Sequence, residues 1–185
     1  MKQTSIILFA IIAFTSCEKK SKDFVIAKKQ VGKITDSTTV AQMKEWYKTD
    51  SIVKNTEGQG AFEPYDEYKI IDKKDKKLLI IVVPVKTGDE ASLIKYVEIK
   101  SDRFHTDKGV SIASDFGTLN KNHKLGKIDE SLKNIVIYVD DLNATVNMRK
   151  DVLPLNVRND ASIKIEATLI PDNAKIKDFV VFMNE

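Results

Sequence analysis

The chain contains few of the residues that most often carry covalent chemistry. Its 185 residues include one cysteine, Cys17, two histidines and one tryptophan. A single thiol cannot form a disulfide within the chain, and it cannot supply a set of cysteine ligands to a metal ion. The seven glycines form no phosphate-binding loop, and there is no Gly-x-Ser-x-Gly motif and no Ser-x-x-Lys motif at the start of a helix. A disulfide framework and the common nucleophile motifs are therefore excluded.

Excess charge and long apolar runs are also missing from the body of the chain. Thirty basic residues against 27 acidic residues give a formal net charge of +3, which creates no strong field for a nucleic acid. After residue 16 the longest apolar run is Leu78–Val85, which has the length of a strand and contains Pro84. The composition predicts a soluble body with no nucleic-acid partner.

The N-terminus carries the most informative motif. Lys2 precedes a ten-residue apolar segment, Ser5–Phe14, which is too short to span a bilayer. Phe14-Thr15-Ser16-Cys17 then follows, with a large apolar residue, two small residues and the only cysteine. This end of the chain resembles the lipobox signal peptide of bacterial lipoproteins, in a Bacteroidota-like form. An ordinary secretory signal with an incidental cysteine is the alternative.

The resemblance implies that diacylglycerol is attached to the thiol of Cys17 and that the signal is cut just before this residue. The chain then divides into a signal peptide (1–16), a lipidated tether (17–23) and a single globular domain (24–185). The expected location is the bacterial cell envelope, at the outer membrane, on its periplasmic face or at the cell surface. No cofactor is expected apart from the covalent lipid, and the bilayer is the first partner.

Alternating hydrophobicity predicts a mainly antiparallel sheet. Tyr65–Asp72 and Lys76–Lys86 form a predicted hairpin, and Leu93–Lys100 a third strand beside it. The second of these strands is apolar on both faces, which predicts a central position. Further predictions cover a loop over Asn55–Pro64, a short strand over Gly109–Ile112, a hairpin made of Asn134–Asp140 and Thr145–Lys150, a strand or helix over Ile163–Leu169, and a closing strand over Phe179–Met183.

Two short helices complete the expected α+β fold. Thr39-x-x-Gln42 is a capping box, and Ser114 is the predicted N-cap of the second helix. Each helix stands between short strands and precedes a hairpin, so the pattern suggests an internal duplication. The run Lys108–Leu119 is similar to a glycine, strand, cap and short-helix signature of small uncharacterised α+β envelope lipoproteins.

The histidines offer the only candidates for acid–base or metal chemistry. His105 and Asp107 would share one face of an extended segment, and His123 stands apart. Three or four ligands are needed for zinc, and no nearby residue completes the set. Asp140, Asp141 and Asn143 have oxygens suited to calcium, but these residues also favour turns. No metal site is predicted.

Aromatic residues give the candidate binding surface. Trp46, Tyr47, Phe62 and Tyr65 lie in or beside the first helix and the glycine-containing loop. Exposed aromatic side chains would suit a protein, peptide or glycan partner, whereas buried ones would only complete the core.

The predicted function is a non-catalytic binding or accessory module. Its partner would be another envelope protein or a small ligand. Two alternatives are an envelope hydrolase that uses His105 or His123 as a base, and an inhibitor or immunity lipoprotein that acts through a protruding loop at Asn55–Pro64.

Overall fold

Two β-sheets form the framework of the molecule. The computed structural model describes residues 22–58, 63–158, 160 and 162–184. Eight antiparallel strands make the larger sheet, in the order β4-β5-β6-β7-β12-β11-β10-β9. The smaller sheet has the order β3-β2-β1-β8, in which only β1 and β8 run parallel. The predicted α+β class with a mainly antiparallel sheet is confirmed.

The strands of the larger sheet are β4 (Ser51–Glu57), β5 (Tyr65–Ile71), β6 (Leu78–Pro84), β7 (Ile94–Ile99), β9 (Leu125–Glu130), β10 (Asn134–Val139), β11 (Ala144–Arg149) and β12 (Ile176–Phe182). Those of the smaller sheet are β1 (Val25–Ala27), β2 (Gln30–Val31), β3 (Ile34–Thr35) and β8 (His105–Thr106). The helices are α1 (Val40–Trp46), α2 (Phe116–Asn122) and α3 (Leu155–Arg158), with 3₁₀ turns at Lys22–Phe24, Lys150–Val152 and Ala167–Leu169. Within these described ranges, every helix is too short to cross a membrane.

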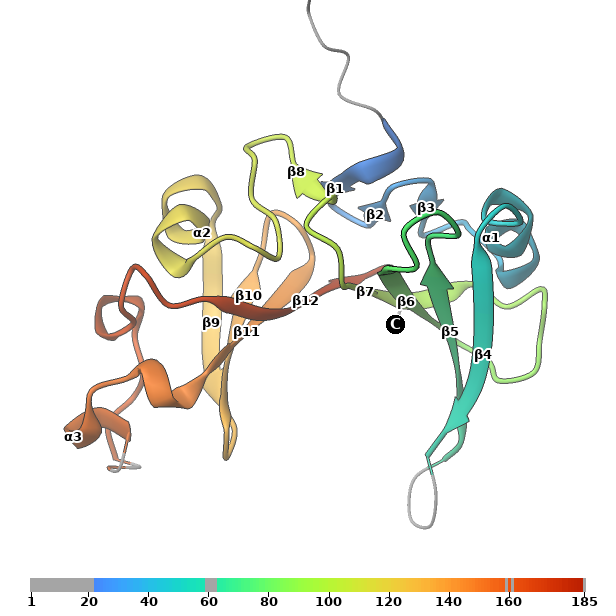
Figure 1. Ribbon diagram of the computed structural model, residues 1–185. Helices are drawn as coiled ribbons and strands as arrows, with labels where there is room; N and C mark the ends of the chain where they lie inside the picture. The colour runs from blue at the N-terminus through green and yellow to red at the C-terminus, as the bar shows by residue number, and fades with distance from the viewer. Residues whose placement is uncertain (1–21, 59–62, 159, 161, 185) are drawn as a thin grey trace, which may run out of the picture.

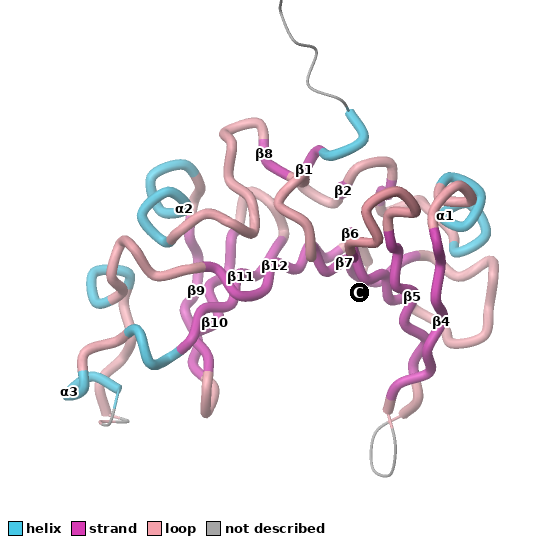
Figure 2. The backbone as a smooth tube through the Cα atoms, viewed as in Figure 1, coloured by secondary structure: helices cyan, strands magenta, loops and turns pink. Residues whose placement is uncertain are grey.

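The larger sheet bends into an arch whose middle is the β7–β12 pair (Figure 1). Strands β4 and β5 descend on one side of the arch, and β9 and β10 descend on the other. Helices α1 and α2 lie at the two outer ends, and the smaller sheet lies over the middle (Figure 2). The chain enters the described structure beside β1, on the side of the smaller sheet.

The two halves of the arch repeat the same arrangement. Each half contains a seven-residue helix followed by four strands, and the two last strands meet in the middle. Thr39 caps α1 and bridges to Leu93, the residue before β7. Asp115 caps α2 and bridges to Lys175, the residue before β12. The predicted capping box of Thr39 and Gln42 is present.

Several hydrogen bonds around the start of α1 have an equivalent around the start of α2. The N–H of Thr35 donates to the Thr38 hydroxyl at 2.8 Å, and the N–H of Ser111 donates to the Ser114 hydroxyl at 3.0 Å. The first helical N–H groups donate to the carbonyls of Ser92 and Ala174, respectively. The equivalent buried side chains are Val40 and Met43 in α1, and Phe116 and Leu119 in α2. The internal repeat suggested by the sequence is therefore present in the local structure of both halves.

The predicted hairpins and the central strand are also confirmed. Strand β6 pairs with β5 and β7 on its two sides, and the residues from Leu79 to Pro84 are all buried. Strands β10 and β11 form the second hairpin around a turn that contains Asn143. A strand buried on both faces stands inside the sheet, as its uninterrupted apolar sequence requires.

Several local predictions were wrong. Asn55, inside the predicted loop, belongs to β4, because the ladder continues to the Glu57–Tyr65 pair. Gly109–Ile112 forms only an isolated bridge between Ser111 and His105. The Ser114 hydroxyl is occupied by the Ser111 N–H, so the N-cap is Asp115.

Two predictions near the C-terminus also need correction. Ile163–Leu169 contains neither a strand nor an α-helix, only the 3₁₀ turn at its end. The strand predicted at Phe179–Met183 does not close the sheet. It starts earlier, at Ile176, and lies in the middle of the sheet between β7 and β11.

Gly32 offers a test of the packing between the smaller sheet and the chain entry. Its φ of +56° is left-handed, and a Cβ there would lie 2.6 Å from the Asp23 carbonyl oxygen. We expect Gly32→Ala to lower the free energy of unfolding by about 3 kcal/mol, because backbone strain and a backbone clash combine. Gly109, with a φ of +81° and open space around it, is the matched control. Gly109→Ala should lower the free energy of unfolding by about 1–2 kcal/mol, through backbone strain alone. Equal losses of stability for the two variants in urea denaturation would contradict the predicted clash at Gly32.

Candidate functional site

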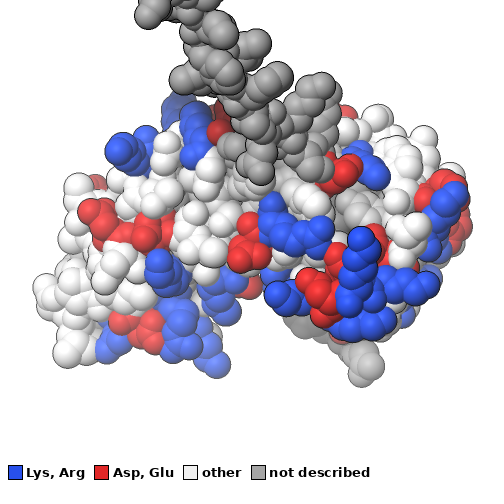
Figure 3. Space-filling model, turned by 45° about the horizontal axis from the view of Figure 1, so that its top comes forward, with Lys and Arg blue, Asp and Glu red and all other residues white. Residues whose placement is uncertain are grey.

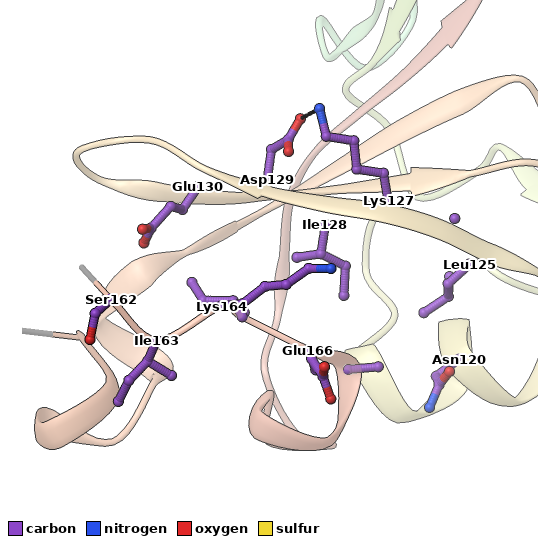
Figure 4. Close-up of a pocket in the computed structure, with 13 residues that line it drawn as sticks. Asn120, Leu125, Lys127, Ile128, Asp129, Glu130, Ser162, Ile163, Lys164 and Glu166 are labelled. Carbon is purple, nitrogen blue, oxygen red and sulfur yellow. Dashed lines mark ion pairs between the residues drawn. The ribbon is translucent and has the colours of Figure 1, made fainter. Parts of the chain in front are cut away.

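A large hollow lies beside β9, at one edge of the larger sheet. It has a volume of about 850 Å³ and is bounded by β9, by Asn120 of α2 and by the segment 162–167. Since β9 is the last strand of the sheet, one of its long sides has no strand partner among the described residues. The segment 162–167 lies opposite that side, so a groove separates the two (Figure 4). We call this the β9 groove.

The floor of the β9 groove is apolar and its rim is polar. Leu125 and Ile128 project from β9 toward the segment 162–167, and the Lys164 side chain runs beneath Ile128 (Figure 4). Ile163 and Ile165 pack against the core from the other wall. The polar lining residues are Asn120, Lys127, Asp129, Glu130, Ser162, Lys164 and Glu166. The lining therefore combines an apolar floor with seven polar residues at the rim, so it can contact both apolar and polar groups of a ligand.

The backbone of β9 presents hydrogen-bonding groups to this groove. In the turn to β10 the Ser131 N–H donates to the Asn134 carbonyl at 2.8 Å, so residue 131 faces β10. The groups of an antiparallel strand alternate in direction, and residue 129 therefore faces β10 as well. The N–H and C=O groups of Ile128 and Glu130 then point away from β10, toward the groove. Strand β9 pairs only with β10 among the described strands, and outside the strand ladders no backbone hydrogen bond between described residues occupies these groups.

The charges at the rim are only partly paired. Lys127 Nζ lies 2.6 Å from Asp129 Oδ2, and Lys150 Nζ lies 2.6 Å from Glu130 Oε2. The hydrogen bond and charge of Asp129 raise the pKa of Lys127. Lys164 and Glu166 form no ion pair with another described residue. These two side chains are free to contact a ligand in the groove.

The predicted aromatic site is not assembled in the described structure. Trp46 is 39% exposed and lines a smaller hollow of about 400 Å³ with Tyr47. Tyr65 is 38% exposed but starts β5, whereas that hollow adjoins Asp72, beyond the other end of β5. Phe62 lies outside the described residues, as does Cys17. Trp46 and Tyr65 therefore do not form one surface.

Tyr47 is a core residue and not an exposed contact. It is 7% exposed, and its hydroxyl has no hydrogen-bond partner among the described residues. Burial raises the pKa of this hydroxyl, and the charges of Asp50 and Asp23 raise it further. Tyr47 is the C-cap of α1, the same position that His123 has in α2.

His123 is the middle member of a row of three hydrogen-bonded side chains. Its Nδ1 lies 3.0 Å from Asp141 Oδ2, and its Nε2 lies 3.1 Å from Thr106 Oγ1. Thr106 is fully buried, and its hydroxyl also accepts the Val110 N–H at 3.1 Å. The order hydroxyl, imidazole, carboxylate resembles that of a nucleophilic triad. A substrate cannot reach a fully buried hydroxyl, so the contacts serve to hold β8 against the end of α2.

Asp141 completes this row at the surface. Partial burial opposes its ionisation, but the hydrogen bond to His123 and the charges of His123 and Lys108 outweigh that effect, so the pKa of Asp141 is lowered. Lys108 Nζ lies 3.7 Å from Asp141 Oδ2. The carboxylate therefore has partners that stabilise its charged form.

His123→Ala should lower the free energy of unfolding by about 2 kcal/mol, because it leaves the buried Thr106 hydroxyl without its acceptor. His105 is the matched control. Its Nδ1 lies 2.9 Å from the Arg103 carbonyl at a half-exposed position, so His105→Ala should change stability by about 0.5 kcal/mol or less. Urea denaturation measures the loss of stability in both variants. A loss of about 0.5 kcal/mol or less for His123→Ala would argue against a structural role of His123.

The other predicted oxygen cluster is a turn. Asn143 has a φ of +52°, and its side-chain amide donates to the Phe182 carbonyl at 2.8 Å. Asp141 is engaged by His123. Across the described ranges, no group of three or more His, Cys, Asp or Glu side chains is arranged to hold a metal ion.

The β9 groove was not found from the sequence. The alternation of Ile163 and Ile165 with Lys164 and Glu166 predicted a strand or helix in its other wall, 162–167, and not the irregular segment observed there. The position of this irregular segment against β9 depends on contacts far apart in the chain.

Fold and groove together define an α+β protein with an antiparallel arch and a ligand-sized groove at one sheet edge. No known family model matches the chain, and no curated protein is similar to it in sequence. Among solved structures it is similar to the uncharacterized protein YfeY from Escherichia coli. The TM-score is 0.53 at 12% sequence identity, over 85% of this chain and 98% of that chain. At this identity the likeness concerns the fold.

Proposed function

We propose that this protein is a lipid-anchored lipoprotein of the bacterial envelope that acts as a non-catalytic binding module. The ligand in this proposal is an extended peptide segment of another envelope protein, held in the β9 groove. The lipobox-like Phe14-Thr15-Ser16-Cys17 supports the anchor. The unpaired edge of β9 carries the rest of the proposal.

A peptide suits this groove better than a compact small molecule. The outward N–H and C=O groups of Ile128 and Glu130 can extend the antiparallel ladder by one strand. A strand added there has Leu125 and Ile128 beside its apolar residues, and Lys164 and Glu166 beside its polar ones. Main-chain hydrogen bonds would supply affinity, and the side-chain contacts would supply sequence preference.

Glu130→Pro should strongly weaken peptide capture and leave the fold intact. Proline removes the N–H of residue 130, which faces the groove and takes no part in the ladder to β10. We expect capture to fall about tenfold or more, as for the loss of one good hydrogen bond to a partner. The readout is photocrosslinking in cells from a photoreactive amino acid at position 164, with the crosslinked peptide identified by mass spectrometry.

Two controls separate the backbone effect from other effects. Glu130→Ala removes the same side chain and its contact with Lys150 but keeps the N–H, so crosslinking should persist. Asp129→Pro removes an N–H that faces β10 and should destabilise the sheet. Undiminished crosslinking by Glu130→Pro would contradict strand addition, and absence of any crosslink from position 164 would contradict peptide capture.

A further inference from the structure

Trp46 and a group of lysines surround the place where the chain enters the described structure. The smaller hollow of about 400 Å³ is lined by Asp23 and Phe24 at the entry, by Lys33 after β2, by Trp46, and by Lys73 and Lys74 in the turn from β5 to β6. We call its rim the entry surface. It lies on the side of the molecule where the described structure begins, beside β1 (Figure 1).

The turn between β5 and β6, at one side of the entry surface, contains more lysines than acidic residues, although Asp23, Asp50 and Asp72 also line the hollow. Asp72-Lys-Lys-Asp-Lys-Lys77 contains four lysines, all exposed, and none of them is ion-paired with another described residue. Asp72 in the same turn is bound by Arg103 at 2.6 Å. Lys28 and Lys29 are also exposed, in the turn after β1. Figure 3, with the top of the molecule turned forward, shows Lys and Arg side chains interspersed with Asp and Glu over this face of the molecule.

Trp46 is the only tryptophan of the chain and is exposed at this surface. An indole ring has an apolar body and one N–H donor, and this combination suits the boundary between lipid headgroups and acyl chains. Lysines beside such a ring are attracted to anionic headgroups. The indole ring of Trp46 and the neighbouring lysines are therefore both suited to an anionic membrane surface.

The segment between Cys17 and Lys22 is short, so a lipid anchor on Cys17 would keep the domain close to the membrane. Only four residues separate Cys17 from Lys22, where the described structure begins. A fully extended chain spans about 3.5 Å per residue, so this stretch reaches roughly 18 Å at most. With lipid on Cys17, Lys22 would lie within roughly 18 Å of the membrane surface.

We infer that the entry surface docks on the anionic headgroups of the membrane to which Cys17 is anchored. The inference rests on the lipid anchor of the proposed function and not on the β9 groove. Docking fixes which side of the domain faces the lipid. The β9 groove, beside α2 at the other end of the arch, then stays open to a partner.

Trp46 is a built-in reporter for this contact. The full lipidated chain would be labelled with fatty acid, purified and reconstituted into phosphatidylcholine vesicles, with or without phosphatidylglycerol. We expect a blue-shifted Trp46 emission in the anionic vesicles, with a loss of intensity when the lipids carry bromine near the headgroup. Salt should weaken both effects, because the attraction is electrostatic.

Charge reversal supplies the matched comparison. The double variant Lys73→Glu, Lys74→Glu should restore most of the quenched emission. The control is the double variant Lys133→Glu, Arg158→Glu. Its two residues lie just before β10 and in α3, away from the entry surface, so its emission should stay quenched. Equal quenching of these two variants, or an unquenched Trp46 in fatty-acid-labelled protein, would overturn docking alone. Absence of the fatty-acid label, which is read before reconstitution, would overturn both the anchor and the docking.

Discussion

Phe179→Ala is expected to lower the free energy of unfolding by about 3–5 kcal/mol, among the largest losses for a single side chain in this protein. Phe179 is fully buried in β12, where it pairs with Ile99 of β7 and Val146 of β11. It therefore stands at the junction of the two halves of the arch. Removing the ring leaves a cavity between strands that are fixed on both sides, so the surrounding structure can relax only in part.

Phe182 in the same strand is the matched control. Its side chain is half-buried and packs edge-on against Tyr96, with ring centroids 6.2 Å apart. Phe182→Ala should cost about 1–2 kcal/mol, because less apolar area is exposed on truncation. Urea denaturation of the two variants compares them directly. Equal losses in the free energy of unfolding would contradict the assignment of Phe179 to the buried face of β12.

Local signals in the sequence predicted those parts of the fold that depend on neighbours in the chain. The capping box of Thr39 and Gln42 is formed by residues three apart, and the hairpin of β5 and β6 by adjacent strands. The continuous apolar run of β6 was enough to place this strand inside the sheet. Each of these features is decided within a few residues, where propensity and periodicity operate.

The parts that were missed depend on long-range pairing. Strand β12 has an apolar sequence that fits an edge or a centre, and its position between β7 and β11 is set by the meeting of the two halves. The N-cap moved from Ser114 to Asp115 because the Ser114 hydroxyl accepts the Ser111 N–H. The β9 groove was missed for the same general reason, since its second wall is an irregular segment about 40 residues further along the chain.

Cys17→Ser is expected to abolish fatty-acid labelling completely and to stop normal maturation of the chain. The hydroxyl of serine is a much weaker nucleophile than a thiolate, and the chain has no second cysteine to replace it. Two or three acyl chains hold a protein far more firmly than one, since each buried methylene contributes about 0.8 kcal/mol. Loss of the label should therefore release the protein from the membrane fraction.

Ser16→Ala provides the control for this prediction. It keeps a small residue before the cysteine, so labelling and membrane attachment should continue. Metabolic labelling with a radioactive fatty acid, followed by membrane fractionation, measures both variants. A labelled Cys17→Ser protein would contradict the anchor, and an unlabelled wild-type protein would do so as well.

Hydrogen exchange at β9 tests the central proposal, peptide capture by strand addition, most directly. The peptide identified by crosslinking at position 164 would be added in excess to the full chain, and amide exchange would be followed residue by residue. We expect the amides of Ile128 and Glu130 to exchange quickly in the free protein and to become strongly protected in the complex, whereas the amide of Asp129 should be protected in both. A bound peptide that leaves the amides of Ile128 and Glu130 in fast exchange would contradict strand addition.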